Sequence, residues 1–316
     1  MIITLTPNPS VDRTVRLERL VAGTVNRTDR ARVEASGKGV NVTRVLRAHG
    51  VNSIAVLPAG GAEGDQLLSL LAVAEVPVRA VPVSGAVRVN VSVVTPGGET
   101  TKLNEPGPVL SASDVESLLM ATAEVVAETE ARWLVISGTL PPGAHPELVA
   151  RAVKAGHTAG ARVAVDAGGP ALVAAAGAGA DLLAPNLAEL GDTAGGVLAT
   201  LAEVAAAARG LGPRSSWLVT LGADGALLVT PRHCLRGEPP AIDVVNTVGA
   251  GDALLAGWVA EETDDEAARL ARAVAWGTSA CLAMGTAELP EHLVTAEAVT
   301  IRDPDLYPRR PAGTAS

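Results

Sequence analysis

Short strand-like and longer helix-like segments alternate along most of this 316-residue sequence. Parallel strands need crossover connections, which are usually helices, so this order predicts an α/β fold with a mostly parallel sheet covered by helices on both faces. The expected strands are Ile2–Thr6, Ser53–Leu57, Trp133–Ser137, Arg162–Asp166, a short one near Leu182, Trp217–Thr220 and its hairpin partner Ala226–Val229. The expected helices are Val40–His49, Gly64–Val73, Ala112–Glu128, Pro146–Ala159, Gly195–Arg209 and those after Gly251.

Ligands of open parallel sheets bind beyond the carboxyl ends of the strands. Several segments of the chain follow expected strands and should therefore meet at one edge of the sheet, together with Asp252. These segments are Thr139–Gly143, Asp166–Gly169, Asn186–Glu189 and Gly222–Gly225. We expect the functional site at this edge.

Two stretches, Thr14–Ser36 and Ala86–Asn104, interrupt the alternation. In the second stretch, valines alternate with polar residues, which is the pattern of a strand with one apolar and one polar face. Pro96-Gly97-Gly98 turns the chain, and Thr100–Asn104 returns as a hairpin partner. We expect a small accessory sheet, a lid, whose polar face looks at the active site. That face carries Arg88, Asn90 and Lys102.

The apolar face of the lid needs a cover, because large exposed apolar patches are rare on monomeric proteins. The sheet of a second subunit is the simplest cover, so we expect a homodimer through the lid. Residues 1–302 are expected to form a single domain with the lid strands inserted in it. Residues 303–316 are rich in Pro, Arg, Gly and Ser and are expected to be poorly ordered.

Charge and composition narrow the range of partners. The net charge of −9 and the lack of a basic run argue against a nucleic-acid partner. No apolar run approaches the roughly 20 residues that span a bilayer, and the start of the chain lacks the basic region of a signal peptide. Two cysteines and five histidines show no metal-ligand spacing. We therefore expect a protein of the reduced cytoplasm with no membrane partner.

The segment Val245–Asp252 is the strongest candidate for the chemistry. Gly249, Ala250 and Gly251 have almost no side chain, and a helical run follows them. A helix start offers unpaired N–H donors and a positive dipole end, so this segment suits a phosphate. An acid directly after such a site, Asp252, suits a general base that takes a proton from an attacking hydroxyl. An ordinary tight turn followed by a first-turn acid explains the same residues.

A second glycine-rich segment, Ser36–Val42, lies at the start of an expected helix. Gly37 and Gly39 let the backbone approach a polyhydroxy ligand, to which Lys38 and Asn41 can hydrogen-bond. A helix start with an incidental lysine is the alternative. Asp12 can accept from sugar hydroxyls or cap a turn.

Three other groups have two interpretations each. Arg88 and Lys102 suit a phosphate already on the substrate, or they are solvated bases. Asn186 and Glu189 offer oxygen ligands for Mg²⁺ at helical spacing, but a plain capping box explains that spacing better. The segment Leu221–Gly225 contacts a nucleotide or forms only a hairpin turn.

Taken together, these segments resemble the PfkB, or ribokinase-like, carbohydrate kinases, and within them the branch of 1-phosphofructokinases and tagatose-6-phosphate kinases. The resemblance runs from Thr4–Asp12 to Met284–Thr286, and both family signatures are legible, as Gly37–Val42 and Asn246–Ala253. Further similar segments lie between them in the family's order. They are Arg88–Val91, Asn104–Pro108, Ser137–Gly143, Pro185–Asn186 with Glu189, and Thr220–Gly225.

The resemblance implies a ribokinase-like fold with a β-sheet lid, ATP as donor, Mg²⁺, and transfer of the γ-phosphoryl group to a hydroxyl of a sugar phosphate. By position, Asp252 resembles the catalytic base, and Gly249, Ala250 and Gly251 resemble the anion hole. The positions that resemble substrate contacts are Asp12, Gly37, Lys38, Asn41, Arg88, Asn90 and Ser137, to which the residue pattern adds Lys102. Those that resemble nucleotide contacts are Thr220, Gly222, Gly225 and Thr247, while Asn186 and Glu189 resemble the motif that organises the Mg²⁺ shell beside the nucleotide, through water.

The chain departs from the family pattern at two positions. Ala184 stands where the family commonly has a lysine before Pro-Asn, and Ser36 replaces the first glycine of Gly-Gly-Lys-Gly. The missing lysine removes a positive charge near the nucleotide phosphates or the metal, which puts the affinity for ATP in question.

The residues leave the substrate open. Arg88–Val91 and Ser36–Asn41 are most similar to 1-phosphofructokinases, which make fructose 1,6-bisphosphate from fructose 1-phosphate, whereas Val25–Thr28 and Asn41–Leu46 favour tagatose-6-phosphate kinases. A 6-phosphofructokinase and a kinase of nucleosides or free sugars are further alternatives. A non-catalytic sugar-phosphate sensor is the alternative of another class. A Rossmann dehydrogenase is disfavoured, because no Gly-x-Gly-x-x-Gly follows the first strand.

Overall fold

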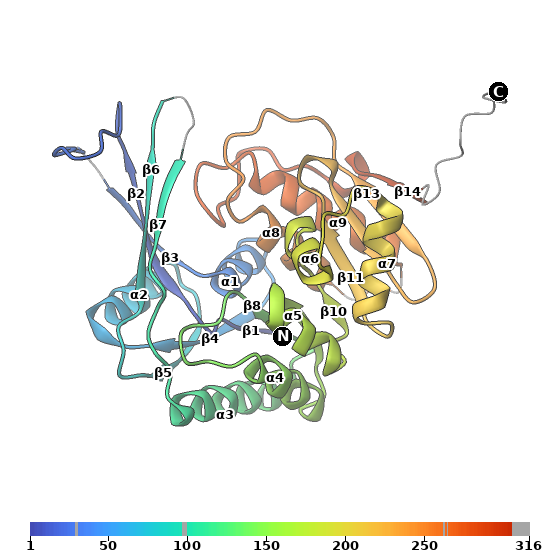
Figure 1. Ribbon diagram of the computed structural model, residues 1–316, viewed down its shortest axis with the longest axis horizontal. Coiled ribbons are helices and arrows are strands. Elements are labelled where there is room, and N and C mark those ends of the chain that lie inside the picture. Colours follow the sequence, from blue (N-terminus) through green and yellow to red (C-terminus); the bar gives the residue numbers. More distant parts are fainter. Residues whose placement is uncertain (29–30, 97–99, 262, 264, 305–316) are drawn as a thin grey trace. The chain divides into compact units, whose positions relative to one another are not determined.

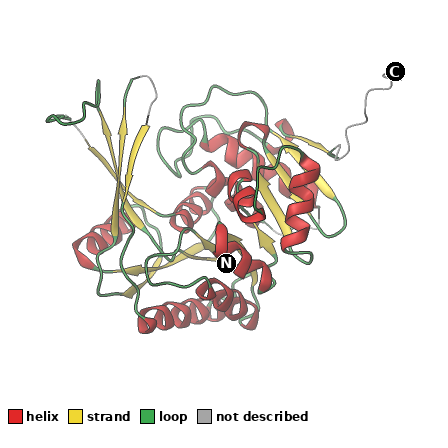
Figure 2. Cartoon of the chain, viewed as in Figure 1, coloured by secondary structure: helices red, strands yellow, loops and turns green. Residues whose placement is uncertain are grey.

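The computed structural model describes residues 1–28, 31–96, 100–261, 263 and 265–304 (Figure 1). The chain divides into two compact units, residues 1–163 and 164–316, and the boundary falls within strand β9. Figure 2 shows that both contain strands and helices.

The first unit contains a parallel sheet with the strand order β8-β1-β4-β5. Its strands are β1 (Ile2–Leu5), β4 (Ser53–Ala59), β5 (Val78–Pro82) and β8 (Trp133–Ser137). The central strand β1 is completely buried and lies between β4 and β8, with Ile2 opposite both Ser53 and Trp133. A strand buried on both faces reads as a continuous apolar run, as the start of this chain does.

Four helices accompany this sheet. They are α1 (Lys38–Ala48), α2 (Gly61–Val73), α3 (Ala112–Glu128) and α4 (Glu147–Thr158). Figure 1 shows α1 above the sheet and α3 with α4 below it, and α1 and α3 both contact β1. The helices therefore cover both faces of the sheet, as the alternation of strands and helices predicts.

A separate four-stranded sheet, called the small sheet below, has the strand order β3-β2-β6-β7. Its strands are β2 (Ser10–Arg16), β3 (Ala31–Ser36), β6 (Arg88–Val94) and β7 (Thr100–Asn104). It confirms the expected accessory sheet from the two stretches that interrupt the alternation. The predicted turn at Pro96-Gly97-Gly98 lies partly outside the described residues.

The two faces of the small sheet differ in polarity, as the period-two pattern predicts. Directly paired residues share a face, and the pairing of Asp12 with Glu34 and Asn90, and of Ser92 with Lys102, places polar side chains on one face. The opposite face is mostly apolar, apart from Arg13 and Thr101, and at one end Val11 is completely buried in a cluster with side chains of α2. Helix α2 thus supplies part of the cover that we expected from a second subunit.

The second unit contains a sheet with the strand order β14-β13-β12-β11-β10-β9. Its strands are β9 (Arg162–Asp166), β10 (Leu182–Leu183), β11 (Ser216–Thr220), β12 (Ala226–Val229), β13 (Cys234–Glu238) and β14 (Thr300–Arg302). The pairs from β9 to β11 are parallel and those from β11 to β14 are antiparallel. The predicted hairpin between β11 and β12 is confirmed.

The helices of the second unit pack against this sheet and against each other. They are α5 (Gly169–Gly177), α6 (Leu187–Ala194), α7 (Leu201–Leu211), α8 (Ala250–Val259) and α9 (Glu266–Ala280), with short 3₁₀ turns η1 (Gly222–Asp224) and η2 (Ala296–Ala298). Helix α7 contacts β12, helix α9 contacts β12 to β14, and α8 packs along α9. The expected α/β fold with a mostly parallel sheet and a small additional sheet is confirmed.

One predicted helix, Gly195–Arg209, is confirmed only in part, because α7 runs from Leu201 to Leu211. Gly195, whose φ of 90° is left-handed, instead follows the end of α6, and α7 starts only after Thr200. The Thr200 hydroxyl accepts a hydrogen bond from Glu203 N, and this cap fixes the later start. The periodicity of the apolar residues alone hides a break of this kind.

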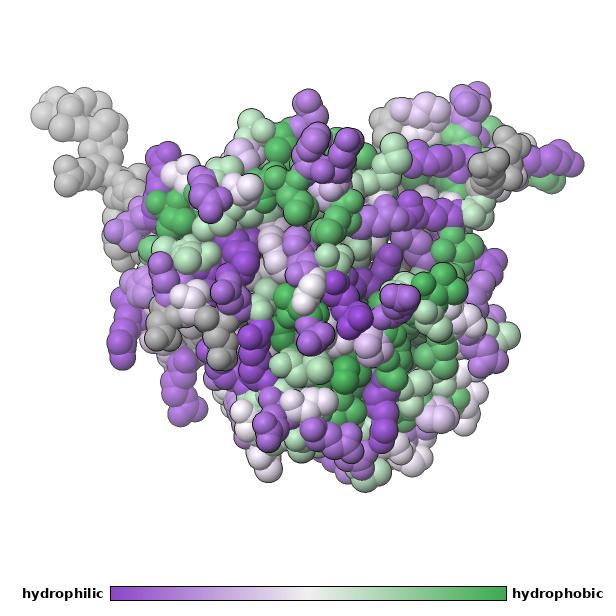
Figure 3. All heavy atoms as spheres, turned by 180° about the vertical axis from the view of Figure 1, so that it is seen from behind, coloured by the Kyte–Doolittle hydropathy of each residue, from purple (hydrophilic) through white to green (hydrophobic). Residues whose placement is uncertain are grey.

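Two further expectations concern membrane-spanning segments and the C-terminal tail. None of the described helices is both long and apolar enough to cross a membrane, and Figure 3 shows hydrophilic and hydrophobic residues interspersed on the face in view. Of the tail that we expected to be poorly ordered, residues 305–316 lie outside the described part of the chain.

Candidate active site

The predicted site residues fall into two groups, one in each unit. Those in the first unit are Asp12, Gly37, Lys38, Asn41, Arg88, Asn90, Lys102 and Ser137. Those in the second unit are Asn186, Glu189, Thr220, Gly222, Gly225, Thr247, Gly249, Ala250, Gly251 and Asp252.

In the first unit, the start of helix α1 requires glycine. Gly37 precedes the helix with a φ of 123°, and a Cβ there would lie 2.9 Å from Thr6 Cγ2 and 3.1 Å from Pro9 Cα. A Cβ at Gly39 would collide with the Thr6 hydroxyl. No side-chain hydrogen bond caps the start of this helix, and uncapped N–H groups of a first helical turn are suited to an anionic or hydroxyl ligand.

Asp12 lies at the centre of a hydrogen-bonded group on the polar face of the small sheet. Its Oδ1 accepts from Ser10 Oγ at 2.7 Å and from Asn90 Nδ2 at 2.9 Å. Asn90 is its neighbour on the parallel strand, so the register itself brings the two side chains together. The Asn90 Oδ1 is buried and makes no hydrogen bond with the described residues. This arrangement presents a fixed carboxylate and an amide to a polyhydroxy ligand.

A backbone hydrogen bond holds the Arg88 guanidinium. Its Nη2 donates to the backbone carbonyl of Asn8 at 3.0 Å, while its buried Nε has no hydrogen-bond partner among the described residues. Burial lowers the pKa of the Arg88 guanidinium, and the charge of Asp12 opposes this shift. An arginine stays protonated under such a shift, so the site keeps a positive charge beside its carboxylate.

Asn8 is a residue that the sequence analysis missed. It is buried, its Nδ2 donates to Pro106 O at 3.0 Å and to Thr139 Oγ1 at 3.4 Å, and its carbonyl holds Arg88. It therefore connects three loops of the first unit. The one feature of the sequence that could have indicated this role is the position of Asn8 between two prolines.

Lys102 and Arg88 share the polar face but not a position along it. Arg88 pairs with Ser10, whereas Lys102 pairs with Ser92, and the rung of Asn90 separates them. Lys102 is exposed, and Arg32, which the sequence analysis did not single out, occupies the same rung on β3. Arg32 Nε pairs with Glu34 Oε2 at 2.8 Å.

Ser137 and Lys38 come from neighbouring segments of the first unit. Ser137 is the buried last residue of β8, and a Cβ at the following Gly138 would lie 3.9 Å from Lys38 Cβ. Asn41 is also buried, one turn into α1. All the predicted substrate residues except Lys102 thus lie at strand ends, the start of α1 or the inner part of the small sheet.

In the second unit, helix α8 begins at the predicted phosphate segment. Gly249 is left-handed, with a φ of 84°, and no side chain caps the helix. A Cβ at Gly249 would lie 2.8 Å from Thr286 Cγ2 and 3.9 Å from Asp252 Oδ2. Asp252 is only 6% exposed. A buried carboxylate thus stands in the first turn of a helix without a side-chain cap, at the helix's positive end, where the Ala250 N–H donates to Thr247 O at 3.3 Å.

Main-chain and amide hydrogen bonds hold the segment before α8. The N–H groups of Val245 and Asn246 both donate to Cys281 O, at 2.8 and 3.2 Å. Asn246 Oδ1 accepts from Val248 N at 3.0 Å, and its Nδ2 donates to Met284 O at 3.3 Å. Thr247, the predicted nucleotide contact in this segment, is exposed.

Asn186 and Glu189 form the capping box that the sequence analysis favoured. Glu189 N donates to Asn186 Oδ1 at 2.8 Å, and Asn186 N donates to Glu189 Oε2 at 2.9 Å. Among the described residues, no cluster of three or more His, Cys, Asp or Glu side chains is arranged to hold a metal. Any Mg²⁺ here would need water and phosphate oxygens to complete its ligands.

Thr220 and Asn186 lie next to each other as partners of an isolated parallel bridge. Gly222 and Gly225, in the turn after β11, both have positive φ, at 65° and 87°. Ala184, at the position of the family lysine, is buried at the end of β10, and its N–H donates to Val165 O at 2.8 Å.

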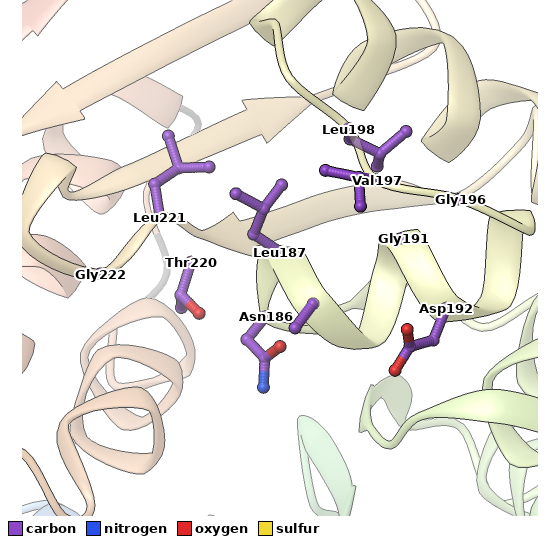
Figure 4. A pocket seen from close by; sticks show the side chains of 11 residues that line it. Asn186, Leu187, Gly191, Asp192, Gly196, Val197, Leu198, Thr220, Leu221 and Gly222 are labelled. Carbon is purple, nitrogen blue, oxygen red and sulfur yellow. The ribbon is translucent and has the colours of Figure 1, made fainter.

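A cleft of about 650 Å³ opens beside Asn186, Thr220 and Gly222. In Figure 4 the side chains of Leu187, Val197, Leu198 and Leu221 occupy its upper part, and those of Asn186, Thr220 and Asp192 point into the lower part. Among the described residues that line it, none belongs to Gly249–Asp252. The cleft therefore joins three of the predicted nucleotide contacts to an apolar wall that the sequence analysis missed.

Known proteins resemble the whole chain. The model of the pfkB family of carbohydrate kinases matches residues 5–290. The 1-phosphofructokinase of Rhodobacter capsulatus is 38% identical over 284 residues, which cover 87% of this chain and 89% of that protein. The ATP-dependent 6-phosphofructokinase isozyme 2 of Escherichia coli is 35% identical and covers 90% of this chain and 94% of its own.

Solved structures agree with the sequence comparison. Phosphofructokinase-2 from Escherichia coli, solved in complex with substrates and products, aligns with a TM-score of 0.82 at 32% identity, covering 92% of this chain and 95% of that one. The family model spans most of the residues, the Rhodobacter capsulatus protein is similar over most of its length, and the Escherichia coli structure has the same fold. The chain therefore belongs to the pfkB family of carbohydrate kinases.

Proposed function

We propose that this chain transfers the γ-phosphoryl group of ATP to a hydroxyl of a ketohexose phosphate, converting fructose 1-phosphate to fructose 1,6-bisphosphate. The observation that carries the proposal is the buried carboxylate of Asp252 in the first turn of α8, directly after left-handed Gly249. The names of the relatives support the substrate class, since the Rhodobacter capsulatus and Haloferax volcanii proteins are both 1-phosphofructokinases.

In the proposed reaction, Asp252 accepts the proton of the attacking hydroxyl. The hydroxyl oxygen forms a bond to the γ-phosphorus, and the bond from that phosphorus to the bridging oxygen of ADP breaks, so ADP leaves with the electron pair. The N–H groups of Gly249, Ala250 and Gly251 stabilise the negative charge on the phosphoryl oxygens. Burial of Asp252 excludes water that would otherwise compete with the sugar.

The residues of the first unit are proposed to hold the sugar phosphate. Asp12 and Asn90 accept and donate at the sugar hydroxyls, with Lys38, Asn41 and Ser137 beside them. Arg88 carries the fixed positive charge for the existing phosphate, because Asn8 orients its guanidinium from the far side. Lys102 extends from an exposed strand and adds a mobile charge.

The residues of the second unit are proposed to hold Mg²⁺ and ATP. Asn186 and Glu189 fit Mg²⁺ only as partial ligands, through water, because the single side-chain oxygen of Asn186 and one of the two carboxylate oxygens of Glu189 already serve the cap of α6. Bound Mg²⁺ supplies positive charge for the phosphate oxygens. Thr220, Gly222, Gly225 and Thr247 contact the nucleotide, and residues 1–302 act as one kinase domain.

The test of the proposal is an ADP-release assay with Mg-ATP and four acceptors at equal concentration. These are fructose 1-phosphate, fructose 6-phosphate, tagatose 6-phosphate and free fructose. We expect the highest kcat/KM for fructose 1-phosphate. A preference for fructose 6-phosphate would instead favour the activity named for the Escherichia coli relative, and silence on all four with sugar-phosphate binding retained would favour a sensor.

Asp252→Asn should lower kcat at least about a hundredfold, because the amide cannot accept the proton. Binding of the sugar phosphate, measured by calorimetry, should stay nearly unchanged. A variant with substantial remaining activity would show that another group is the base.

Arg88→Ala should raise KM for the sugar phosphate about tenfold or more and leave KM for ATP nearly unchanged, because a charged hydrogen bond to the phosphate is lost. Arg13→Ala is the matched control, since Arg13 lies on the opposite face of the same sheet. Equal increases in both KM values for Arg88→Ala would contradict its role at the substrate.

Asn186→Ala and Thr200→Ala remove the same kind of helix cap, from α6 and from α7. Each should lower the free energy of unfolding by about 1 kcal/mol, measured by urea denaturation. Only Asn186→Ala should raise KM for Mg-ATP. A similar kinetic effect of both variants would mean that Asn186 acts through helix stability alone.

We also propose a homodimer through the small sheet. Helix α2 covers one end of its apolar face, but Leu103 on the same face is 61% exposed. Leu103→Asp should shift the sedimentation coefficient from dimer to monomer. Asn104→Asp, on the polar face of the same strand, should not. A monomeric unmodified protein would contradict the proposal.

A further inference from the structure

Helices α8 and α9 pack antiparallel and unusually closely. A Cβ at Gly257 of α8 would lie 2.9 Å from Ala273 Cα and 3.1 Å from Arg272 O. A Cβ at Gly277 of α9 would lie 3.0 Å from Leu254 Cβ and 3.1 Å from Ala250 O. Ordinary carbon contacts are about 3.5–4.0 Å, so neither glycine leaves room for a side chain. Two glycines at opposite ends of the contact set the distance between the helices.

The two close contacts differ in what they touch. Gly257 lies near the end of α8, whereas Gly277 faces Leu254 and the carbonyl of Ala250, the first residue of that helix. A Cβ at position 277 would be closer than an ordinary contact to both the Ala250 carbonyl oxygen and Leu254 Cβ. The position of the first turn of α8 therefore depends on the missing side chain of Gly277.

The last turn of α9 contacts the preceding segment as well. The carbonyl of Cys281, which follows α9, accepts from the N–H groups of both Val245 and Asn246. Asn246 thus contacts the residue that follows α9, and Ala250 contacts α9 itself. The loop that contains Gly249 is held between these two contacts.

The far end of α8 is fixed by two arginines of α9. Arg272 Nε donates to Gly257 O at 2.8 Å, and Arg269 Nη2 donates to Trp258 O at 3.4 Å. Arg272 also pairs with Glu261 at 2.8 Å. Because this end is anchored, a methyl group at position 277 cannot be relieved by moving the whole helix. Leu254 and the Ala250 carbonyl would have to shift by a few tenths of an ångström to accommodate it.

We propose that Gly277 is a positioning residue, which sets the first turn of α8, and with it Asp252 and the main-chain N–H groups, for phosphoryl transfer. This inference rests on the proposed function. Gly277 touches no substrate and acts only through the Ala250 carbonyl and Leu254. Transfer rates depend steeply on such placement, whereas affinity for each substrate depends on other contacts.

The test compares three glycine-to-alanine variants. Gly277→Ala and Gly257→Ala place the same methyl group at opposite ends of one helix pair, and Gly210→Ala places it in α7, where its surroundings are open. We measure kcat, both KM values and thermal unfolding for each variant and for the unmodified protein. Gly277→Ala should lower kcat at least about tenfold with both KM values nearly unchanged. Gly257→Ala should lower the melting temperature by about as much as Gly277→Ala does, but it should retain kcat. Gly210→Ala should retain both the melting temperature and kcat.

The outcomes distinguish a failure of the proposed function from a failure of the positioning role of Gly277. An unmodified protein that is inactive on all four acceptors would overturn the proposed function. An active protein in which Gly277→Ala and Gly257→Ala lose the same fraction of kcat would overturn only the role of Gly277. If Gly277→Ala does not fold, Leu254→Ala and Leu255→Ala replace it, since both are buried in α8 but only Leu254 contacts Gly277. Leu254→Ala should then lower kcat more than Leu255→Ala, and equal losses would overturn the proposal.

Discussion

The structure depends on main-chain N–H groups at helix starts that no side chain of the protein occupies. Helices α1 and α8 follow Gly37 and Gly249, and neither has a side-chain cap. Helices α2, α4 and α5 also lack a side-chain cap, whereas α3, α6, α7 and α9 are capped at Ser111, Asn186, Thr200 and Asp265. In a chain with a net charge of −9, uncapped helix starts are a source of positive potential that adds no basic residue. The proposed sugar and phosphoryl sites both use it.

Those helix starts in turn depend on close packing by small residues. Gly37 and Gly39 lie against Thr6, Gly249 lies against Thr286, and Gly277 lies against Ala250. A sequence with no Phe and a single Tyr builds these contacts from glycine, alanine and short β-branched side chains. Small residues tolerate little change in volume, so single methyl groups become effective probes of the geometry. The side chains of Asn8 and Asn246 add hydrogen bonds to the backbone of the loops beside these helix starts.

Local patterns predicted much of the fold and of the candidate site. The bounds of α3, β8, β9 and β12 agree with the periodicity residue by residue, because strong alternation and clear caps are local properties. The helix expected at Gly195–Arg209 starts only at Leu201, since a left-handed glycine ends the preceding helix and a capping threonine sets the start of α7. Asn8, Arg32 and Gly277 were not recognised, because each matters only through residues far away in the sequence.

The sequence by itself determined the α/β class, the family and the identity of the glycines and acids at the two helix starts, because these follow from short-range order along the chain. Only the tertiary structure decided how those residues are used. It separated Arg88 from Lys102 by a rung of the small sheet, placed α2 under part of an apolar face for which a second subunit was the expected cover, and brought Gly277 against Leu254 and the Ala250 carbonyl of α8. Strand register and helix packing distance are set by side chains from distant segments, and no local pattern encodes them.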